Sequence, residues 1–155
     1  MKSALIPKYE GGSFAAVTLM VSRMRPSLPV VCVVDDDDSS RESLDSLLRA
    51  AGFEAHAFTS AATFLDWDSR KQASCLISDF VMTPMNGAEM QQALAARGRD
   101  YPIIFVTAFA DHELERRLLA QGAVGVLPKP FDAEVLIELV ERSTRERPIR
   151  DGSPR

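Results

Sequence analysis

The feature that most constrains this fold is a continuous apolar run over residues 30–34, Val-Val-Cys-Val-Val, which stops abruptly at four consecutive aspartates. An apolar run without polar alternation is typical of a strand that is covered on both faces, as the strands of parallel sheets are. Parallel strands are joined by crossover connections, and these are usually helices. The run therefore predicts the first strand of a sheet that lies between helices.

The same unit, an apolar strand followed by an amphipathic helix, recurs along the chain as far as residue 145. In the first helix leucines recur at helical spacing, and we expect Ser39 or Ser40 to cap this helix and Gly52 to end it. The other expected elements are strands over 53–59, 75–78, 103–107 and 123–127, and helices that start at Ser60, cover 89–97 and 111–121, and run from residue 131 or 132 to 145.

This alternation of five strands with five helices predicts the α/β class, with parallel strands, right-handed crossovers and helices on both faces of the sheet. We expect a single domain over residues 29–145. Residues 1–28 are expected to be a poorly ordered N-terminal extension. Residues 146–155 contain mainly Arg, Pro, Gly, Ser and Asp, and we expect a disordered tail or the start of a linker there.

Composition and charge exclude several kinds of protein. There are 18 Lys and Arg against 22 Asp and Glu, a formal net charge of −4, so no global positive field attracts nucleic acid. Cys32 and Cys75 lack the spacing of a zinc site or a disulfide framework, and their places in neighbouring strands predict buried, inert thiols. No apolar run approaches the roughly 20 residues that cross a bilayer. We therefore expect a cytoplasmic protein that binds neither membranes nor, through this chain, nucleic acid.

Polar residues follow the predicted strands at the positions where chemistry is expected. In open parallel sheets the functional crevice lies beyond the carboxyl ends of the strands. Asp35 and Asp36 follow the first strand, and Asp79 follows the third. Thr107 ends the fourth strand, and Lys129 follows the fifth. The sequence therefore predicts that three carboxylates, a hydroxyl and an ammonium converge at one edge of the sheet.

Converging carboxylates repel one another unless a cation or a proton compensates their charge. Mg²⁺ binds carboxylate, carbonyl, water and phosphate oxygens, whereas zinc prefers the histidine or thiolate ligands that this set lacks. A carboxylate can also attack phosphorus and form an aspartyl-phosphate, and Asp79 is the best placed nucleophile. Acidic residues near a helix N-terminus also interact favourably with the helix dipole, and that is the role we expect for Asp37 and Asp38.

Five motifs in this order resemble the receiver domain of two-component response regulators over residues 29–145. The residues of the first motif and those that follow it are most similar to the FixJ-type branch of that family. The motifs are Val33-Val34-Asp35-Asp36 with Arg41 following, Leu76-Ile77-Ser78-Asp79, the loop Met82-Thr83-Pro84-Met85-Asn86-Gly87, Val106-Thr107-Ala108, and Lys129-Pro130-Phe131.

The resemblance implies a flavodoxin-like (βα)5 domain with the strand order 2-1-3-4-5. It implies that Asp79 accepts a phosphoryl group from a sensor histidine kinase or a histidine phosphotransfer protein. Asp35, Asp36 and Asp79 would hold Mg²⁺. The main-chain carbonyl of Val81 would be a further ligand, and Lys129 would contact a phosphoryl oxygen. Such a domain assists its own phosphorylation and slow dephosphorylation and is not an enzyme that acts on other substrates.

The resemblance also implies a switch. Thr107 would move to form a hydrogen bond with the phosphoryl group, and the Lys129–Pro130 bond is expected to be cis. The movement would change the surface formed by the helix over 111–121, the strand over 123–127 and the last helix. That surface would bind a downstream protein or a second copy of the chain.

Three departures from the family pattern stand out. The family loop usually has proline at the position of Thr83, and here proline follows one residue later, at Pro84. Val126 occupies the position that usually holds a switching aromatic residue. Many FixJ-type proteins carry a C-terminal helix-turn-helix domain, and this chain stops before one would begin. Transcriptional output is therefore not assigned to this chain directly.

Two alternatives remain open at this point. The pattern Asp36-x-Asp38-x-Ser40 also fits haloacid-dehalogenase-type phosphatases, in which Asp36 would be the nucleophile. That family needs a further acidic magnesium ligand, which only Asp132 or Glu134 offers, and it leaves Asp79 without a role. The other alternative is a pseudo-receiver, which keeps the fold and binds proteins without being phosphorylated.

Overall fold

The computed structural model describes residues 28–67 and 73–145, together with residue 16. Five strands form one parallel sheet in the order β2-β1-β3-β4-β5, which confirms the predicted fold class and strand order. The strands are β1 (Val30–Val34), β2 (Glu54–Phe58), β3 (Cys75–Asp79), β4 (Ile103–Thr107) and β5 (Gly125–Pro128). The helices that alternate with them are α2 (Asp38–Ala50), α3 (Ala61–Leu65), α4 (Gly87–Ala96), α5 (His112–Ala120) and α6 (Ala133–Arg145).

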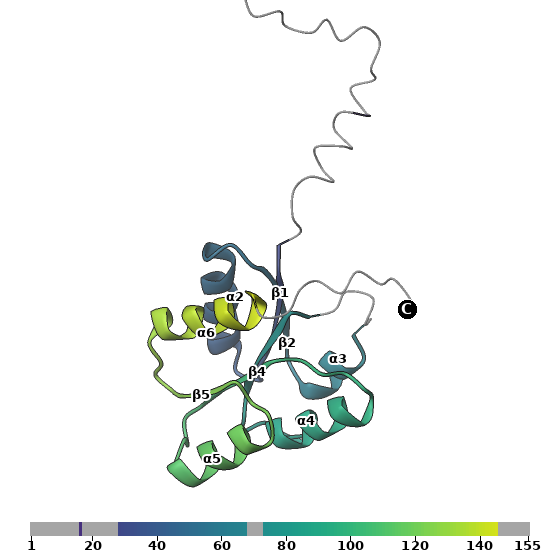
Figure 1. Cartoon of the computed structure of the whole chain (residues 1–155), viewed down its shortest axis with the longest axis vertical. Coiled ribbons are helices and arrows are strands. Elements are labelled where there is room, and N and C mark those ends of the chain that lie inside the picture. The colour runs from purple at the N-terminus through teal and green to yellow at the C-terminus, as the bar shows by residue number, and fades with distance from the viewer. Residues whose placement is uncertain (1–15, 17–27, 68–72, 146–155) are drawn as a thin grey trace, which may run out of the picture.

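Two layers of helices enclose the sheet (Figure 1). On one face, Leu48 of α2 and Leu136 of α6 belong to the same buried cluster. On the other face, a second cluster contains Phe64 of α3, Leu94 of α4 and Leu118 of α5. Because β1, β3 and β4 are covered on both faces, their residues are almost all apolar, and polar side chains collect at the strand ends.

Asp37, and not Ser39 or Ser40, caps α2. The Asp37 carboxylate accepts hydrogen bonds from the backbone N–H groups of Ser39 at 2.9 Å and of Ser40 at 3.4 Å. The predicted serine cap is therefore wrong, because a carboxylate closer to the strand already satisfies these two helix-end donors. Ser60 caps α3 as predicted, through a reciprocal capping box with Thr63.

The last strand begins later than predicted, at Gly125 rather than at residue 123. Gly122 has the left-handed conformation with a φ of 102°, and the N–H of Ala123 donates to the carbonyl of Leu118 at 3.0 Å. These two features are those of a Schellman turn at the end of α5. Ala123 therefore completes the helix end before the chain enters the sheet.

The two cysteines lie in adjacent strands and face opposite sides of the sheet. Cys32 belongs to the cluster covered by α3, α4 and α5, and Cys75 to the cluster covered by α2 and α6. Burial raises the pKa of both thiols to about 12. Both thiols are free, and at neutral pH they are protonated, as expected for inert buried cysteines.

The predictions for the terminal segments lie outside the described residues, apart from residues 16 and 28. They stay predictions. Among the helices of the described segments, none is both long enough and apolar enough to cross a membrane.

Candidate functional site

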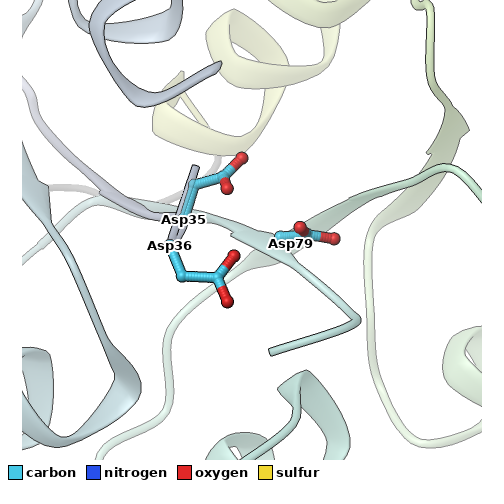
Figure 2. A group of neighbouring side chains, drawn as sticks. All are labelled: Asp35, Asp36 and Asp79. Carbon is cyan, nitrogen blue, oxygen red and sulfur yellow. The ribbon is translucent and has the colours of Figure 1, made fainter. Parts of the chain in front are cut away.

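The carboxylates that were predicted to converge do so at the carboxyl ends of β1 and β3 (Figure 2). Asp35 and Asp36 follow β1 directly, and Asp79 is the last residue of β3. One carboxylate oxygen of each residue lies within 4.8 Å of the others. Asp35 is only 1% exposed, whereas Asp79 is half-buried and Asp36 is exposed. The cluster therefore has one enclosed member and two that solvent can reach.

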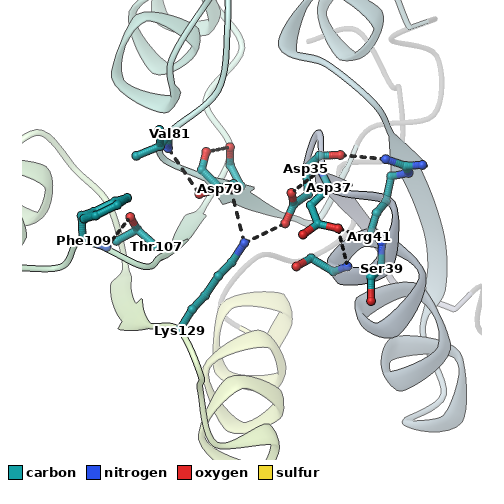
Figure 3. A network of polar contacts seen from close by, with 11 residues as sticks. Asp35, Asp37, Ser39, Arg41, Asp79, Val81, Thr107, Phe109 and Lys129 are labelled. Atoms are coloured by element: carbon teal, nitrogen blue, oxygen red, sulfur yellow. Dashed lines mark hydrogen bonds and ion pairs between the residues drawn. The ribbon is translucent and has the colours of Figure 1, made fainter.

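Asp35 is held by hydrogen bonds from several elements (Figure 3). Its backbone N–H donates to the carbonyl of Phe58 at 3.2 Å, which continues the pairing of β1 with β2. Its Oδ1 accepts from the N–H of Asp37 at 2.9 Å, and its backbone carbonyl accepts from Arg41 Nη1 at 3.0 Å. A buried carboxylate needs such partners, because leaving it without them is costly. Arg41 also forms an ion pair with Asp38 within α2, and its bond to the Asp35 carbonyl ties this helix to the strand end.

Lys129 supplies the cation of the site. Its Nζ lies 3.0 Å from Asp35 Oδ2 and 3.4 Å from Asp79 Oδ2, so one ammonium lies between two carboxylates (Figure 3). The backbone N–H of Lys129 donates to the carbonyl of Thr107 at 2.8 Å. That bond joins the segment after β5 to the end of β4 and places the lysine over the site.

The two proline positions of the site loops share one backbone feature. The Lys129–Pro130 bond is cis, as predicted, and the Thr83–Pro84 bond is cis as well.

Val126, at the position where the family usually has an aromatic residue, is half-buried against the cluster beneath α3, α4 and α5. This residue therefore packs against the core of that face and keeps part of its surface exposed.

The electrostatic balance of the site is negative. Burial raises the pKa of Asp79, and the charge of Asp35 raises it further, while Lys129 and the N–H of Val81, 3.3 Å from Asp79 Oδ1, oppose the shift without cancelling it. Burial lowers the pKa of Lys129, but its hydrogen bond to Asp35 and the charges of both carboxylates outweigh burial and leave that pKa raised. Three carboxylates with one ammonium therefore favour a further cation.

The donor set fits a hard divalent cation. Asp35, Asp36 and Asp79 offer carboxylate oxygens within 4.8 Å of one another, and no histidine or cysteine belongs to the cluster. Such oxygen ligands suit Mg²⁺ and not zinc. Val81, whose carbonyl was predicted to be a further ligand, donates its N–H to Asp79 and is 47% exposed.

Thr107 reaches the same edge from β4, and its hydroxyl is engaged with the following loop. Its Oγ1 accepts a hydrogen bond from the N–H of Phe109 at 3.2 Å (Figure 3). Thr107 is fully buried, whereas Phe109 is 72% exposed. Because this hydroxyl serves as an acceptor here, its own hydrogen is available to a further oxygen.

Two residues of the site carry no predicted role. Arg41 was named from the sequence only as part of a family motif and was given no role. In the structure Arg41, six residues after Asp35, donates to the Asp35 carbonyl at the strand end. Phe109 has no sequence signal, because its exposure depends on the path of the loop between β4 and α5. The geometry therefore adds one cation near the strand end and one exposed aromatic ring near Thr107.

A family model described as the response regulator receiver domain matches residues 31–141. The chain belongs to this family. The response regulator protein TodT of Pseudomonas putida is 34% identical over 127 residues, which are 81% of this chain and 56% of TodT. The transcriptional regulatory protein FixJ of Azorhizobium caulinodans is 39% identical over 120 residues, which are 77% of this chain and 56% of FixJ. The predicted receiver family and its FixJ-like character are thus confirmed.

Solved structures agree with these relatives. The response regulator StyR has 40% sequence identity and a TM-score of 0.70, over 77% of this chain and 61% of StyR. The structure named FixJ-N has 30% identity and a TM-score of 0.71, over 81% of this chain and 98% of FixJ-N. The chain spans about half the length of the curated relatives that it matches.

Family membership separates a receiver domain from the phosphatase alternative, whereas a pseudo-receiver has the same fold and would match the same family. Receiver domains are regulatory parts of two-component systems, which implies histidine kinase partners, and they are not enzymes in the usual sense. The phosphatase alternative has no support in the family or in the site. Asp132 accepts a hydrogen bond from the N–H of Glu134 at 2.8 Å at the start of α6, and neither residue belongs to the carboxylate cluster.

Proposed function

We propose that this receiver is a phosphorylation-dependent switch in which Asp79 accepts a phosphoryl group from a histidine kinase or a histidine phosphotransfer protein. The observation that carries the proposal is the Lys129 ammonium between Asp35 and Asp79, at 3.0 and 3.4 Å, in a cluster of three carboxylates. Asp35 is almost fully buried, and within the described residues no hydrogen bond or ion pair joins Asp36 to Lys129. Asp79 alone combines access to solvent with the neighbouring cation.

The transfer is a displacement at phosphorus. A carboxylate oxygen of Asp79 attacks phosphorus, the phosphorus–nitrogen bond of a donor phosphohistidine breaks, and its electron pair returns to the imidazole. Lys129 lies where it can neutralise a phosphoryl oxygen, as the transferred charge requires. Asp35, Asp36, Asp79 and the carbonyl of Val81 would hold Mg²⁺, which neutralises phosphoryl charge when bound. Attack by water on the aspartyl-phosphate then restores Asp79 and releases phosphate.

The switch in this proposal begins at Thr107. Its hydroxyl donates to a phosphoryl oxygen on Asp79, and the loop that carries Phe109 follows. The surface formed by α5, β5 and α6 responds, because α5 begins at the end of this loop. Leu119 of α5 and Val124, directly before β5, are 42% and 43% exposed, and they offer apolar contact to a downstream protein or a second copy. In this proposal residues 29–145 are the working unit, and it acts in the cytoplasm.

The test is the intact mass of the chain after incubation with a small phosphodonor, with and without Mg²⁺. We expect the native chain to gain one phosphoryl group in the presence of Mg²⁺ and Asp79→Asn to gain none. Asp37→Asn is the matched control, because it makes the same change at a neighbouring exposed carboxylate and asparagine is a good helix cap. This control should be phosphorylated like the native chain.

Other outcomes would contradict the proposal in different ways. A native chain that stays unmodified while its fold is intact would favour the pseudo-receiver, a module that binds proteins without phosphorylation. Labelling that survives in Asp79→Asn would mean that another carboxylate is the acceptor. Labelling that does not depend on Mg²⁺ would contradict the metal ligands proposed here.

A further inference from the structure

The two ends of α5 are held unequally. Leu118, in the C-terminal half, is fully buried, and Leu114 is only partly buried. His112 and Glu113, in the first turn, are exposed. Ala108 and Phe109, which follow Thr107 and lead toward this turn, are exposed as well. The one fully buried side chain of α5 therefore lies near its C-terminal end, where the other residues of the last turns are exposed, and the first turn, which follows Thr107 in the chain, has only partly buried contacts beside it.

A side chain from α4 holds the better packed end. Gln91 Nε2 donates a hydrogen bond to the backbone carbonyl of Gln121, the C-cap residue of α5, at 3.1 Å. The last carbonyls of a helix have no partner within the helix itself. Gln91 supplies a partner for the Gln121 carbonyl from a neighbouring helix, 30 positions away in the chain.

The helix that carries Gln91 is a firm support. Met90 and Leu94 of α4 are buried, on either side of Gln91 in the sequence. At the start of α4, Gly87 packs so closely that an added Cβ would lie 2.6 Å from the ring of Phe105 in β4. The position of Gln91 is therefore set by the packing of α4 on the sheet.

Gln91 makes this contact at a cost. Its Oε1 is buried and has no hydrogen-bond partner within the described residues. A buried acceptor without a partner lowers stability. Leucine has a similar size and no polar atom, so it would remove that cost together with the bond to Gln121. The amide is thus explained by the bond that it makes to α5 and not by a general gain in stability.

We propose that Gln91 is a positioning residue that fixes the C-terminal end of α5, so that α5 turns about this end when Thr107 rearranges. This inference rests on the proposed function, because the rearrangement begins with a phosphoryl group on Asp79. With the bond intact, movement is largest at the first turn of α5. Without it, the whole helix loosens, and its exposed face no longer takes one defined orientation.

Amide hydrogen exchange over residues 112–123 tests the proposal, with and without phosphorylation by a small phosphodonor and Mg²⁺. In the native chain we expect phosphorylation to speed exchange in the first turn of α5 and to leave residues 118–123 protected. In Gln91→Leu, exchange over residues 118–123 should rise about fivefold without phosphorylation, the factor that corresponds to one lost hydrogen bond. Phosphorylation of this variant should no longer affect the two ends of α5 differently.

The control is Gln92→Leu, the same substitution at the next residue of α4, which is exposed. It should exchange like the native chain. Gln91→Asn keeps the polar amide but is too short to reach Gln121, and it should reproduce the effect of Gln91→Leu if the latter fails to fold.

Unchanged exchange over residues 118–123 in both Gln91 variants would overturn the proposal. So would a Gln91→Leu chain that exchanges faster but still responds to phosphorylation only at the first turn, because Gln91 would then be merely structural. Phosphoryl incorporation is read separately from intact mass. If no phosphoryl group is gained, the proposed function fails, while exchange in the unmodified chains still tests whether Gln91 holds α5.

Discussion

The β1–β3 side of the site and its β4–α5 side are constructed in opposite ways. On the first, Asp35 is 1% exposed and is bonded to Asp37, Arg41 and Lys129. On the second, the Thr107 hydroxyl accepts one bond, from the N–H of a residue that is largely exposed. In the proposed function the charged groups meet a phosphoryl group, and such groups work best when they are already in place, since moving them is costly. A switching group needs the reverse, a bond that is easily exchanged.

Removal of the Lys129 charge should have the largest effect. Lys129→Met leaves the buried Asp35 without its cation, and we expect the free energy of unfolding to fall by about 3 kcal/mol. Urea unfolding at pH 7 with a chelator present measures it. Arg116→Met removes an exposed cation of α5 and should change stability by less than about 0.5 kcal/mol. Equal losses for the two variants would contradict the rigid role assigned to the β1–β3 side.

The two helix caps give a second comparison. Asp37 caps α2, and Asp111 caps α5 by accepting a hydrogen bond from the N–H of Leu114 at 2.7 Å. Asp37→Ala should lower the free energy of unfolding by about 1 kcal/mol. Asp111→Ala should lower it less, because the first turn of α5 can fray without unfolding the domain, but amide exchange there should rise. Equal losses in urea unfolding, with unchanged exchange in α5, would refute the difference.

Asp79→Asn should increase stability when no divalent cation is present. Burial and the charge of Asp35 raise the pKa of Asp79 above its ordinary value of 3.8, so folding disfavours its ionised form. A group with a raised pKa contributes stability that is fully present below pH 3.8, the unfolded-state value. This stability is lost as the pH rises through the folded-state pKa. We expect the melting temperature of Asp79→Asn to exceed that of the native chain by about 3 °C at pH 7. This advantage should disappear near pH 3.8.

Mg²⁺ provides the control for that comparison. A ligand that binds the folded state raises its melting temperature, and Asp79 is one of the proposed ligands. Added Mg²⁺ should therefore stabilise the native chain more than Asp79→Asn. A native chain and a variant that respond equally to Mg²⁺ would show that Asp79 does not contribute to ion binding.

Phe109→Ala should have the smallest effect on stability. Phe109 is 72% exposed, and the bond to Thr107 comes from its backbone N–H, which alanine retains. We expect the free energy of unfolding to change by less than about 0.5 kcal/mol, measured by urea unfolding. A loss above 1 kcal/mol, the size of a helix-cap effect, would mean that this loop is held as firmly as the β1–β3 side.

Local sequence patterns predicted much of the fold and most of the candidate site. The apolar run over residues 30–34 predicted β1 to the residue, and residues 103–107 predicted β4. Asp35, Asp36 and Asp79 were predicted to meet because parallel strands end at the same edge. The caps show where such patterns stop being sufficient. Asp37 and Ser39 are both good caps, and their order after the strand decides which one reaches the free N–H groups.

Strand and helix periodicity, and the residue that follows each strand, were therefore enough to predict the α/β sheet and the groups at its edge. The contacts among those groups required the packed domain. Lys129 and Asp35 are 94 positions apart, and Gln91 and Gln121 are 30 positions apart. Each of these contacts depends on the register of the strands and on the orientation of the helices against the sheet. Register and orientation are properties of the whole core, since every buried side chain contributes to them, and no short segment encodes them.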